Sequence, residues 1–180
     1  MVGGFKIPQA GAHKGCPYRF PEETTMLRLS PTVAQAIADH AEATYPDECV
    51  GLLFGSLDGE LKTALSAYVV ENRWAGQGSL AECDDASSRR DRFYLDPRDY
   101  LRADREARAS GLEIVGCYHS HPDYPATPSE RDRVGAQAIG GTSFAFVIQS
   151  VRAGAAAELA SWLLVDTGAR FTEEELQLWP

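Results

Sequence analysis

The 180-residue sequence predicts a single α/β domain of the α+β type, in which helices flank a curved, mixed and mostly antiparallel sheet. Three observations predict this class. Several apolar runs have the length of strands rather than of long helices. Two of them flank Asp58-Gly59, a dipeptide typical of a tight β-hairpin turn. Other segments begin with a polar residue followed by proline, which is a usual start of a helix.

The N-terminal residues 1–25 mix Gly, Pro and charged residues without periodicity. We therefore expect a poorly ordered arm, followed by one domain over residues 26–180. A helix is predicted over residues 31–45, because Ser30 is a suitable N-cap and the next residue is proline. Its apolar residues recur every four positions, and Pro46 ends it.

The first half of the domain then continues with a hairpin. Residues 49–54 are predicted to form a buried strand, and residues 61–70 the second strand after the Asp58-Gly59 turn. Residues 72–92 are rich in Gly, Ser, Asp and Arg and have almost no apolar pattern. We expect a long surface loop, and loops of this length are usually functional or disordered.

The second half alternates strands and helices. Its central strand is predicted over residues 112–118 and leads the chain directly to His119. Capping signals predict two helices, one from Asp96-Pro97 to Ser110-Gly111 and one from Thr127-Pro128, a capping box, to about Ala138 before Gly140-Gly141. Further strands are expected at 93–95, 144–148 and 159–165, and a short acidic helix at 172–179.

Composition excludes some classes of function. A net charge of −9 argues against nonspecific nucleic-acid binding, which needs Lys and Arg to neutralise phosphates. The sequence has no apolar run of the roughly 18 residues that a membrane helix needs, and no visible secretory signal. We therefore expect no membrane partner and a cytoplasmic location.

The four cysteines show no C-x-x-C spacing, so a disulfide framework or a four-thiolate zinc site is not predicted. Small buried side chains and one or two exposed thiols are the simpler interpretation. A bridge between Cys83 and Cys117 stays open.

The residues with chemical potential lie around the central strand. His119 and His121 are two positions apart at its end, so both imidazoles face the same side. Ser129 and Asp132 are three apart near a helix start and share one face. Two imidazoles and one carboxylate make a three-ligand zinc set that leaves one position for water, as in catalytic sites.

Each of these residues also has an ordinary interpretation. A single histidine is usually a surface or core residue, an aspartate in the first helical turn complements the helix dipole, and a serine there is usually a cap. The combined spacing is much rarer than any of its parts. There is no Gly-x-Ser-x-Gly elbow or phosphate-binding glycine loop, and Cys117 lies in an apolar strand, where it is expected to be buried and inert.

At these positions the sequence resembles the JAMM, or MPN-plus, metalloproteases, in particular their small prokaryotic branch. The family motif, His-x-His followed by seven residues, Ser, two residues and Asp, is matched in full. Its upstream Glu matches Glu48, three residues before Gly51, although Val50 stands where the family often has Cys. The resemblance covers residues 26–165, including segments 93–97 and 111–116.

The resemblance implies a cytidine-deaminase-like JAMM/MPN fold and one catalytic Zn²⁺ ion held by His119, His121 and Asp132. It implies that Glu48 is the general base and that Ser129 donates a hydrogen bond to the oxyanion of the reaction. Ser120, between the two histidines, is expected to face the other side of the strand and to be structural.

The resemblance also implies a substrate class: an amide or isopeptide bond at the C-terminal tail of a ubiquitin-like or sulfur-carrier protein with a β-grasp fold and a Gly-Gly end. We hypothesise that the 72–92 loop helps to clasp this tail by strand addition, with Arg73, Arg89, Arg90 and Arg92 meeting an acidic partner. The alternatives are a peptidase acting on another class such as cell-wall peptides, and a non-catalytic interaction module. The oligomeric state stays open.

Overall fold

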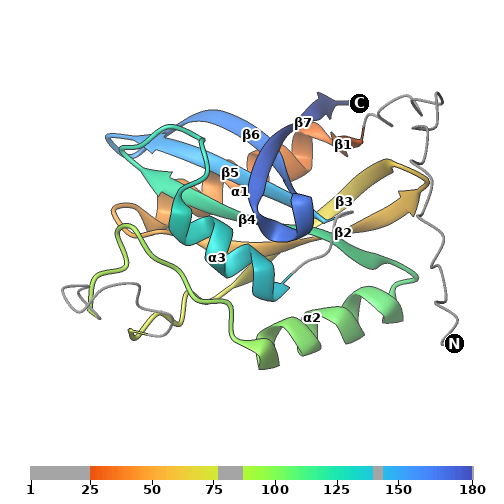
Figure 1. The fold of residues 1–180 in the computed structure, drawn as a ribbon, viewed down its shortest axis with the longest axis horizontal. Helices are drawn as coiled ribbons and strands as arrows, with labels where there is room; N and C mark the ends of the chain where they lie inside the picture. The colour runs from red at the N-terminus through yellow and green to blue at the C-terminus, as the bar shows by residue number, and fades with distance from the viewer. Residues whose placement is uncertain (1–24, 77–86, 140–143, 180) are drawn as a thin grey trace, which may run out of the picture.

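The computed structural model describes residues 25–76, 87–139 and 144–179 (Figure 1). The predicted N-terminal arm, apart from Thr25, and the predicted helix break at Gly140-Gly141 lie outside the described residues. That residues 26–180 form one domain stays a prediction. No helix in the described ranges is both long and apolar enough to cross a membrane.

Seven described strands form one closed barrel in the order β1-β3-β2-β4-β5-β6-β7 (Figure 1). Four neighbouring pairs are antiparallel, and three are parallel: β1 with β3, β1 with β7, and β4 with β5. The predicted mixed, mostly antiparallel sheet is confirmed. The strands are β1 (Met26–Leu29), β2 (Val50–Asp58), β3 (Leu61–Val70), β4 (Glu113–Pro122), β5 (Ala145–Arg152), β6 (Ala155–Val165) and β7 (Arg170–Leu178).

Three α-helices accompany the sheet: α1 (Pro31–Thr44), α2 (Pro97–Ala109) and α3 (Glu130–Ile139). A short 3-10 turn, η1 (Asp166–Gly168), precedes β7. The first two helices begin as predicted, since Ser30 and Asp96 each cap a helix whose next residue is proline. The side chains of both caps accept a hydrogen bond from a backbone N–H in the first turn. Such N–H groups have no carbonyl partner within the helix, so the caps satisfy them.

Two apolar clusters form the core on the two sides of β4. One joins the buried stripe of α1, including Val33 and Ile37, to Leu53 and Tyr118. The other joins α2, through Ala103 and Ala107, to Leu52 and Cys117, and it also includes Ala136 of α3. Because successive strand residues face opposite sides, the cluster of α2 and α3 is on the side to which His119 and His121 point.

The C-terminal tail is a strand, not the predicted acidic helix. Glutamates 173–175 favour a helix by propensity, but β7 pairs with both β6 and β1, and these partners override that preference. Glu174 is 3% exposed, and its carboxylate meets the Lys62 ammonium at 2.7 Å and the Ser161 hydroxyl at 2.8 Å. Strand β1, which sequence reasoning missed, completes the closure.

Two other predictions are corrected. Residues 93–95 form no strand; Tyr94 instead receives a hydrogen bond from the Arg73 N–H through its carbonyl and donates its own N–H to the Asn72 side chain. Helix α3 begins at Glu130 rather than near Pro128, because Ser129 accepts the capping hydrogen bond from Asp132 N–H. The predicted polar loop between β3 and α2 has no helix or strand in its described residues.

Candidate metal centre

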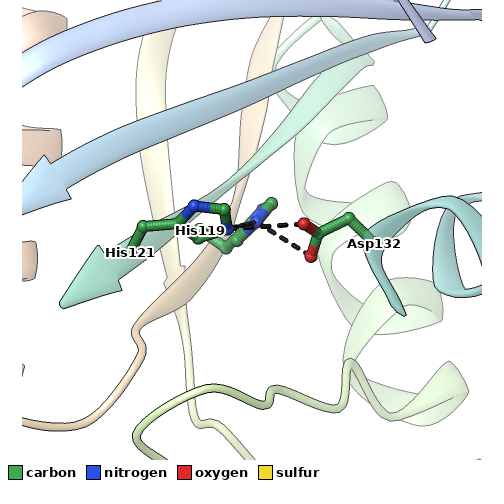
Figure 2. Close-up of side chains that lie close together, drawn as sticks. All are labelled: His119, His121 and Asp132. Carbon is green, nitrogen blue, oxygen red and sulfur yellow. Dashed lines mark hydrogen bonds and ion pairs between the residues drawn. The ribbon is translucent and has the colours of Figure 1, made fainter. Parts of the chain in front are cut away.

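Strand β4 extends beyond its predicted end and carries both histidines within regular structure. Because residues i and i+2 share a face, His119 and His121 point to the same side, as predicted. Asp132 lies in the first turn of α3 and faces them (Figure 2). Among the residues that the structure describes, these three form the one group of metal-ligating side chains that converge, with their ligand atoms within 4.8 Å of one another.

The separations of these atoms fit a tetrahedral ion. The two Nε2 atoms are 3.1 Å apart, and they lie 3.2 Å and 3.4 Å from the carboxylate oxygens of Asp132. Ligands about 2.0–2.1 Å from a tetrahedral zinc are about 3.3 Å from one another. The donor set therefore has both the composition and the spacing that a zinc ion requires.

Electrostatics favours the metal-binding protonation states. All three side chains are buried, and burial lowers the pKa of His119, which keeps its imidazole neutral at pH 7 even though Asp132 acts in the other direction. Burial acts to raise the pKa of Asp132, but the two imidazoles hold it below its ordinary value. For His119 and Asp132 these are the forms that bind a metal, a neutral imidazole and an ionised carboxylate.

The loop that joins β4 to α3 is anchored by hydrogen bonds from several elements. His121 Nδ1 is 2.9 Å from the Pro125 carbonyl, an arrangement that places the proton on Nδ1 and leaves Nε2 as ligand. The Ser150 hydroxyl donates to the Tyr124 carbonyl at 2.6 Å, and the Trp162 indole N–H donates to the Ala126 carbonyl at 2.9 Å. Strands β5 and β6 thus fix the span between the ligands.

Ser129 both caps helix α3 and orients the Asp132 carboxylate. Its Oγ accepts from the Asp132 N–H at 3.2 Å, while its own backbone N–H donates to the Asp132 carboxylate at 2.6 Å. A hydroxyl that accepts in this way keeps its own proton as a donor. The residue is exposed, so its hydroxyl can reach a bound substrate.

Glu48 lies near the cluster of His119, His121 and Asp132 but is not part of it. Its side chain lines the same groove as Asp132, and the residue is 5% exposed. Burial raises its pKa well above the ordinary value, and the charges of Asp132 and Asp91 raise it further. A buried carboxyl with a raised pKa beside a possible metal position is suited to accept and return a proton.

Two residues that sequence reasoning did not assign to the site hold Glu48 in place. The Asn72 amide donates to the Glu48 carbonyl and to the Arg92 carbonyl, both at 2.9 Å, and its oxygen accepts from the Trp74 and Tyr94 N–H groups. Ser120 accepts the Cys49 N–H at 2.8 Å, which confirms that it faces away from the two histidines. The sequence offered one signal for such an anchor, an asparagine two residues after the end of β3.

Three of the four arginines expected to offset charge near the site meet carboxylates of the chain. Arg73 is 2.7 Å from Asp99, and Arg90 is 4.0 Å from Asp123. Arg92 pairs with Asp91 and lies over the Trp74 ring. The contacts of Arg73 and Arg90 hold the loop against α2 and the residue after β4, whereas those of Arg92 lie within the loop. Recruitment of an acidic partner by the loop stays a prediction, and residues 77–86 lie outside the described part of the chain.

The described cysteines have the inert character expected of them. Cys49 and Cys117 are free and buried, and burial raises the pKa of each thiol to about 12. Neither is suited to nucleophilic catalysis at neutral pH. Cys83, the other half of the bridge left open by the sequence, is outside the described residues.

We expect Glu48→Gln to stabilise the metal-free protein at neutral pH. Because the folded pKa lies above the unfolded value, the folded state holds more protons between the two values, and its stability falls as pH rises through that window. Glutamine loses no proton, so its advantage should be absent at pH 4 and grow towards pH 8. Thermal unfolding of chelated protein across this range measures it, with Asp47→Asn as control, and a pH-independent difference would contradict it.

Comparison with known proteins places this site within a matched region. The family described as prokaryotic homologs of the JAB domain matches residues 30–165, which is more than half of the chain and includes every site residue above. Two solved bacterial proteins are similar in structure. One from Desulfitobacterium hafniense has a TM-score of 0.67 and 28% identity, over 86% of this chain and 93% of that one. One from Salinibacter ruber has a TM-score of 0.59 and 31% identity, over 85% and 91%.

Two curated archaeal relatives carry the name Desampylase. The protein of Haloferax volcanii is 28% identical over 114 residues, which are 61% of this chain and 72% of that protein. The protein of Pyrococcus furiosus is 44% identical over 43 residues, which are 24% of this chain and 31% of that protein. The second match therefore spans less than a third of the relative's length.

Proposed function

This chain belongs to the family of prokaryotic homologs of the JAB domain, and on that premise we propose that it is a zinc-dependent peptidase or isopeptidase. Its proposed substrate is an amide bond at the C-terminal tail of a ubiquitin-like or sulfur-carrier protein. One observation carries the proposal: His119, His121 and Asp132 converge at tetrahedral spacing beside the buried carboxyl of Glu48. The relatives named Desampylase and the resemblance to JAMM proteases support the substrate class.

In this proposal the three ligands hold one zinc ion, which when bound supplies a polarised water and withdraws charge from the scissile carbonyl. His119 and His121 bind through Nε2, the nitrogen that each directs at Asp132. Asp132 binds through its carboxylate, which the Ser129 N–H orients. The Asn72 side chain makes four hydrogen bonds, one of them to the carbonyl of the general base Glu48. These bonds hold the backbone around Glu48 in place, so that less of the site has to rearrange during the reaction.

Glu48 moves the proton. Its carboxylate accepts a proton from the attacking water and returns it to the leaving amine, which needs one to depart. Its raised pKa lies closer to the working pH of the enzyme, and a group with such a pKa can both accept and donate a proton. Ser129, whose Oγ accepts from the Asp132 N–H, uses its hydroxyl proton to donate a hydrogen bond to the oxyanion that develops on the attacked carbonyl.

The experiment that tests this function uses zinc-loaded protein and a panel of Gly-Gly-ended β-grasp proteins, each joined to a leaving protein either as a linear fusion or through a lysine side chain. We expect release of the free Gly-Gly end, identified by intact mass. Removal of the metal with a chelator should abolish cleavage, and added zinc should restore it. Failure of zinc-loaded protein to cleave any member, or cleavage that survives chelation, would reject the proposal.

A further inference from the structure

A groove of about 600 Å³ leads away from the candidate metal centre. Helices α2 and α3, which lie on the same side of the sheet (Figure 1), form two of its walls, and residues 91–95 form a third. Glu48 and Asp132 line the catalytic end of the groove. This end lies at the start of α3, since Asp132 is in the first turn of that helix. Its apolar walls include Trp74, Phe93, Tyr100, Leu101, Val134 and Ile139.

We propose that this groove binds the extended tail on the acyl side of the cleaved bond, that it selects a large apolar side chain near the third residue before that bond, and that Gly135 makes room for this side chain. The proposal deepens the proposed function and rests on it. It differs from the loop hypothesis above, because the tail lies against helices α2 and α3 rather than adding a strand to the 72–92 loop.

The length of the groove sets the position of the side chain. Asp132 and Ile139 are seven residues apart on α3, and a helix rises about 1.5 Å per residue, so the wall between them is about 10 Å long. An extended peptide rises about 3.3 Å per residue. A tail whose cleaved carbonyl lies at Asp132 therefore reaches Ile139 with about its third residue upstream.

Gly135 is the position on this wall that the fold itself does not explain. A glycine inside a helix lowers its stability relative to alanine, and Gly135 lies in the middle of α3. A Cβ added there would meet nothing within 4 Å, whereas a Cβ on Gly51 or Gly116 would collide with neighbouring atoms. The two strand glycines are thus required by packing, and the space beside Gly135 belongs to the groove.

The lining determines the chemistry of the occupant. Trp74 and Leu95 are buried, and with Tyr100 and Val134 they offer apolar surface over most of the groove. The cationic residues of the lining, Arg92 and Arg131, already face Asp91. A charged side chain against the apolar walls would therefore lose its hydration without a matching partner, whereas an aliphatic or aromatic one gains by burial. An extended backbone with one large apolar side chain and small residues at the cleaved end fits this shape.

The experiment compares tails and groove variants in zinc-loaded protein. Substrate tails carry leucine, alanine or aspartate at the third and fourth residues before the cleaved bond. We expect leucine to exceed alanine by about 10- to 100-fold in kcat/KM at one of these positions, and aspartate to be poorer than alanine. Gly135→Leu should remove this preference, and Gly135→Ala should reduce it less because it adds one methyl group. Arg105→Leu adds a leucine on an exposed part of α2 outside the groove and should change nothing.

Binding gives a second readout that does not depend on turnover. A fluorescently labelled tail peptide is titrated into Glu48→Gln protein with and without the further substitution Gly135→Leu. We expect the Kd measured by fluorescence anisotropy to be at least tenfold higher for the double variant. Ala138→Leu, on the same wall, replaces Gly135→Leu if that variant unfolds. Equal binding and an unchanged leucine preference would overturn the groove proposal. The groove proposal would also be overturned if the leucine preference depended on residues on the leaving-group side of the cleaved bond. Wild-type protein that binds tails but cleaves none would instead reject the proposed function.

Discussion

Turnover by Glu48→Gln protein is expected to fall by about 10²- to 10⁴-fold, the usual contribution of a general base, with zinc content unchanged. Glutamine has nearly the same shape and keeps both backbone contacts of residue 48, the N–H to the Arg89 carbonyl at 2.7 Å and the carbonyl to the Asn72 amide at 2.9 Å. It cannot accept the proton of the attacking water. The loss should therefore appear in kcat, because the ligands and the groove walls are intact.

The measurement pairs kcat on a cleaved Gly-Gly-tailed substrate with metal analysis of the same samples. Asp47→Asn is the matched control, because it makes the same kind of substitution on the neighbouring and more exposed carboxyl. It should retain kcat. Near-normal turnover by Glu48→Gln would contradict the role of this residue as the base, whereas loss of zinc in that variant would show that the carboxyl acts as a ligand.

Ser129→Ala is expected to lower kcat by about 10²- to 10³-fold, the effect of removing one oxyanion donor. The alanine also removes the cap of α3, at a cost of about 1 kcal/mol in stability. The backbone N–H that orients Asp132 remains, so zinc binding should survive. Because these effects act on different quantities, kcat and the unfolding free energy separate the two roles of the hydroxyl.

Ser129→Thr serves as the control, since it keeps a hydroxyl that can both cap and donate. It should recover most of the stability and a large part of the rate. A Ser129→Ala enzyme that loses stability but keeps its kcat would show that the residue is only a cap.

The sequence predicted the ligand geometry because that geometry is local. His119 and His121 are two residues apart on a strand, and Ser129 and Asp132 share a helix turn, so the spacing alone determines which faces they occupy. The loop between them is short, and its hydrogen bonds to β5 and β6 complete the convergence. Those anchors come from residues 26 and 36 positions further along, which no local pattern indicates.

The features that the sequence did not predict depend on partners distant in the chain. Tail residues 173–175 form a strand because β1 and β6 supply hydrogen-bonding partners and Lys62 supplies a charge. The groove likewise combines Glu48, Trp74, α2 and α3, and its shape depends on how they pack. Gly135 stood in the sequence as an ordinary helix glycine, and only the empty space beside it gives it a role.

The structure bears on the alternatives left open by the sequence. A non-catalytic module has no need of three converging ligands, a buried carboxyl and an oriented hydroxyl in one groove, so the arrangement favours an enzyme. A peptidase acting on cell-wall peptides would use the same catalytic residues. The Gly-Gly-tailed panel distinguishes it, because such an enzyme would leave every β-grasp tail intact.

The most direct measurement is the anomalous scattering of zinc-loaded crystals at the zinc edge, with Asp132→Asn protein as the comparison. We predict one ion per chain within bonding distance of His119 Nε2, His121 Nε2 and an Asp132 oxygen. In the Asp132→Asn variant the zinc affinity should be lower than in the wild type by more than about 10- to 100-fold, which is the usual effect of losing a hydrogen bond that supports a ligand. A zinc ion bound elsewhere, or wild-type crystals that take up none at these three side chains, would contradict the account.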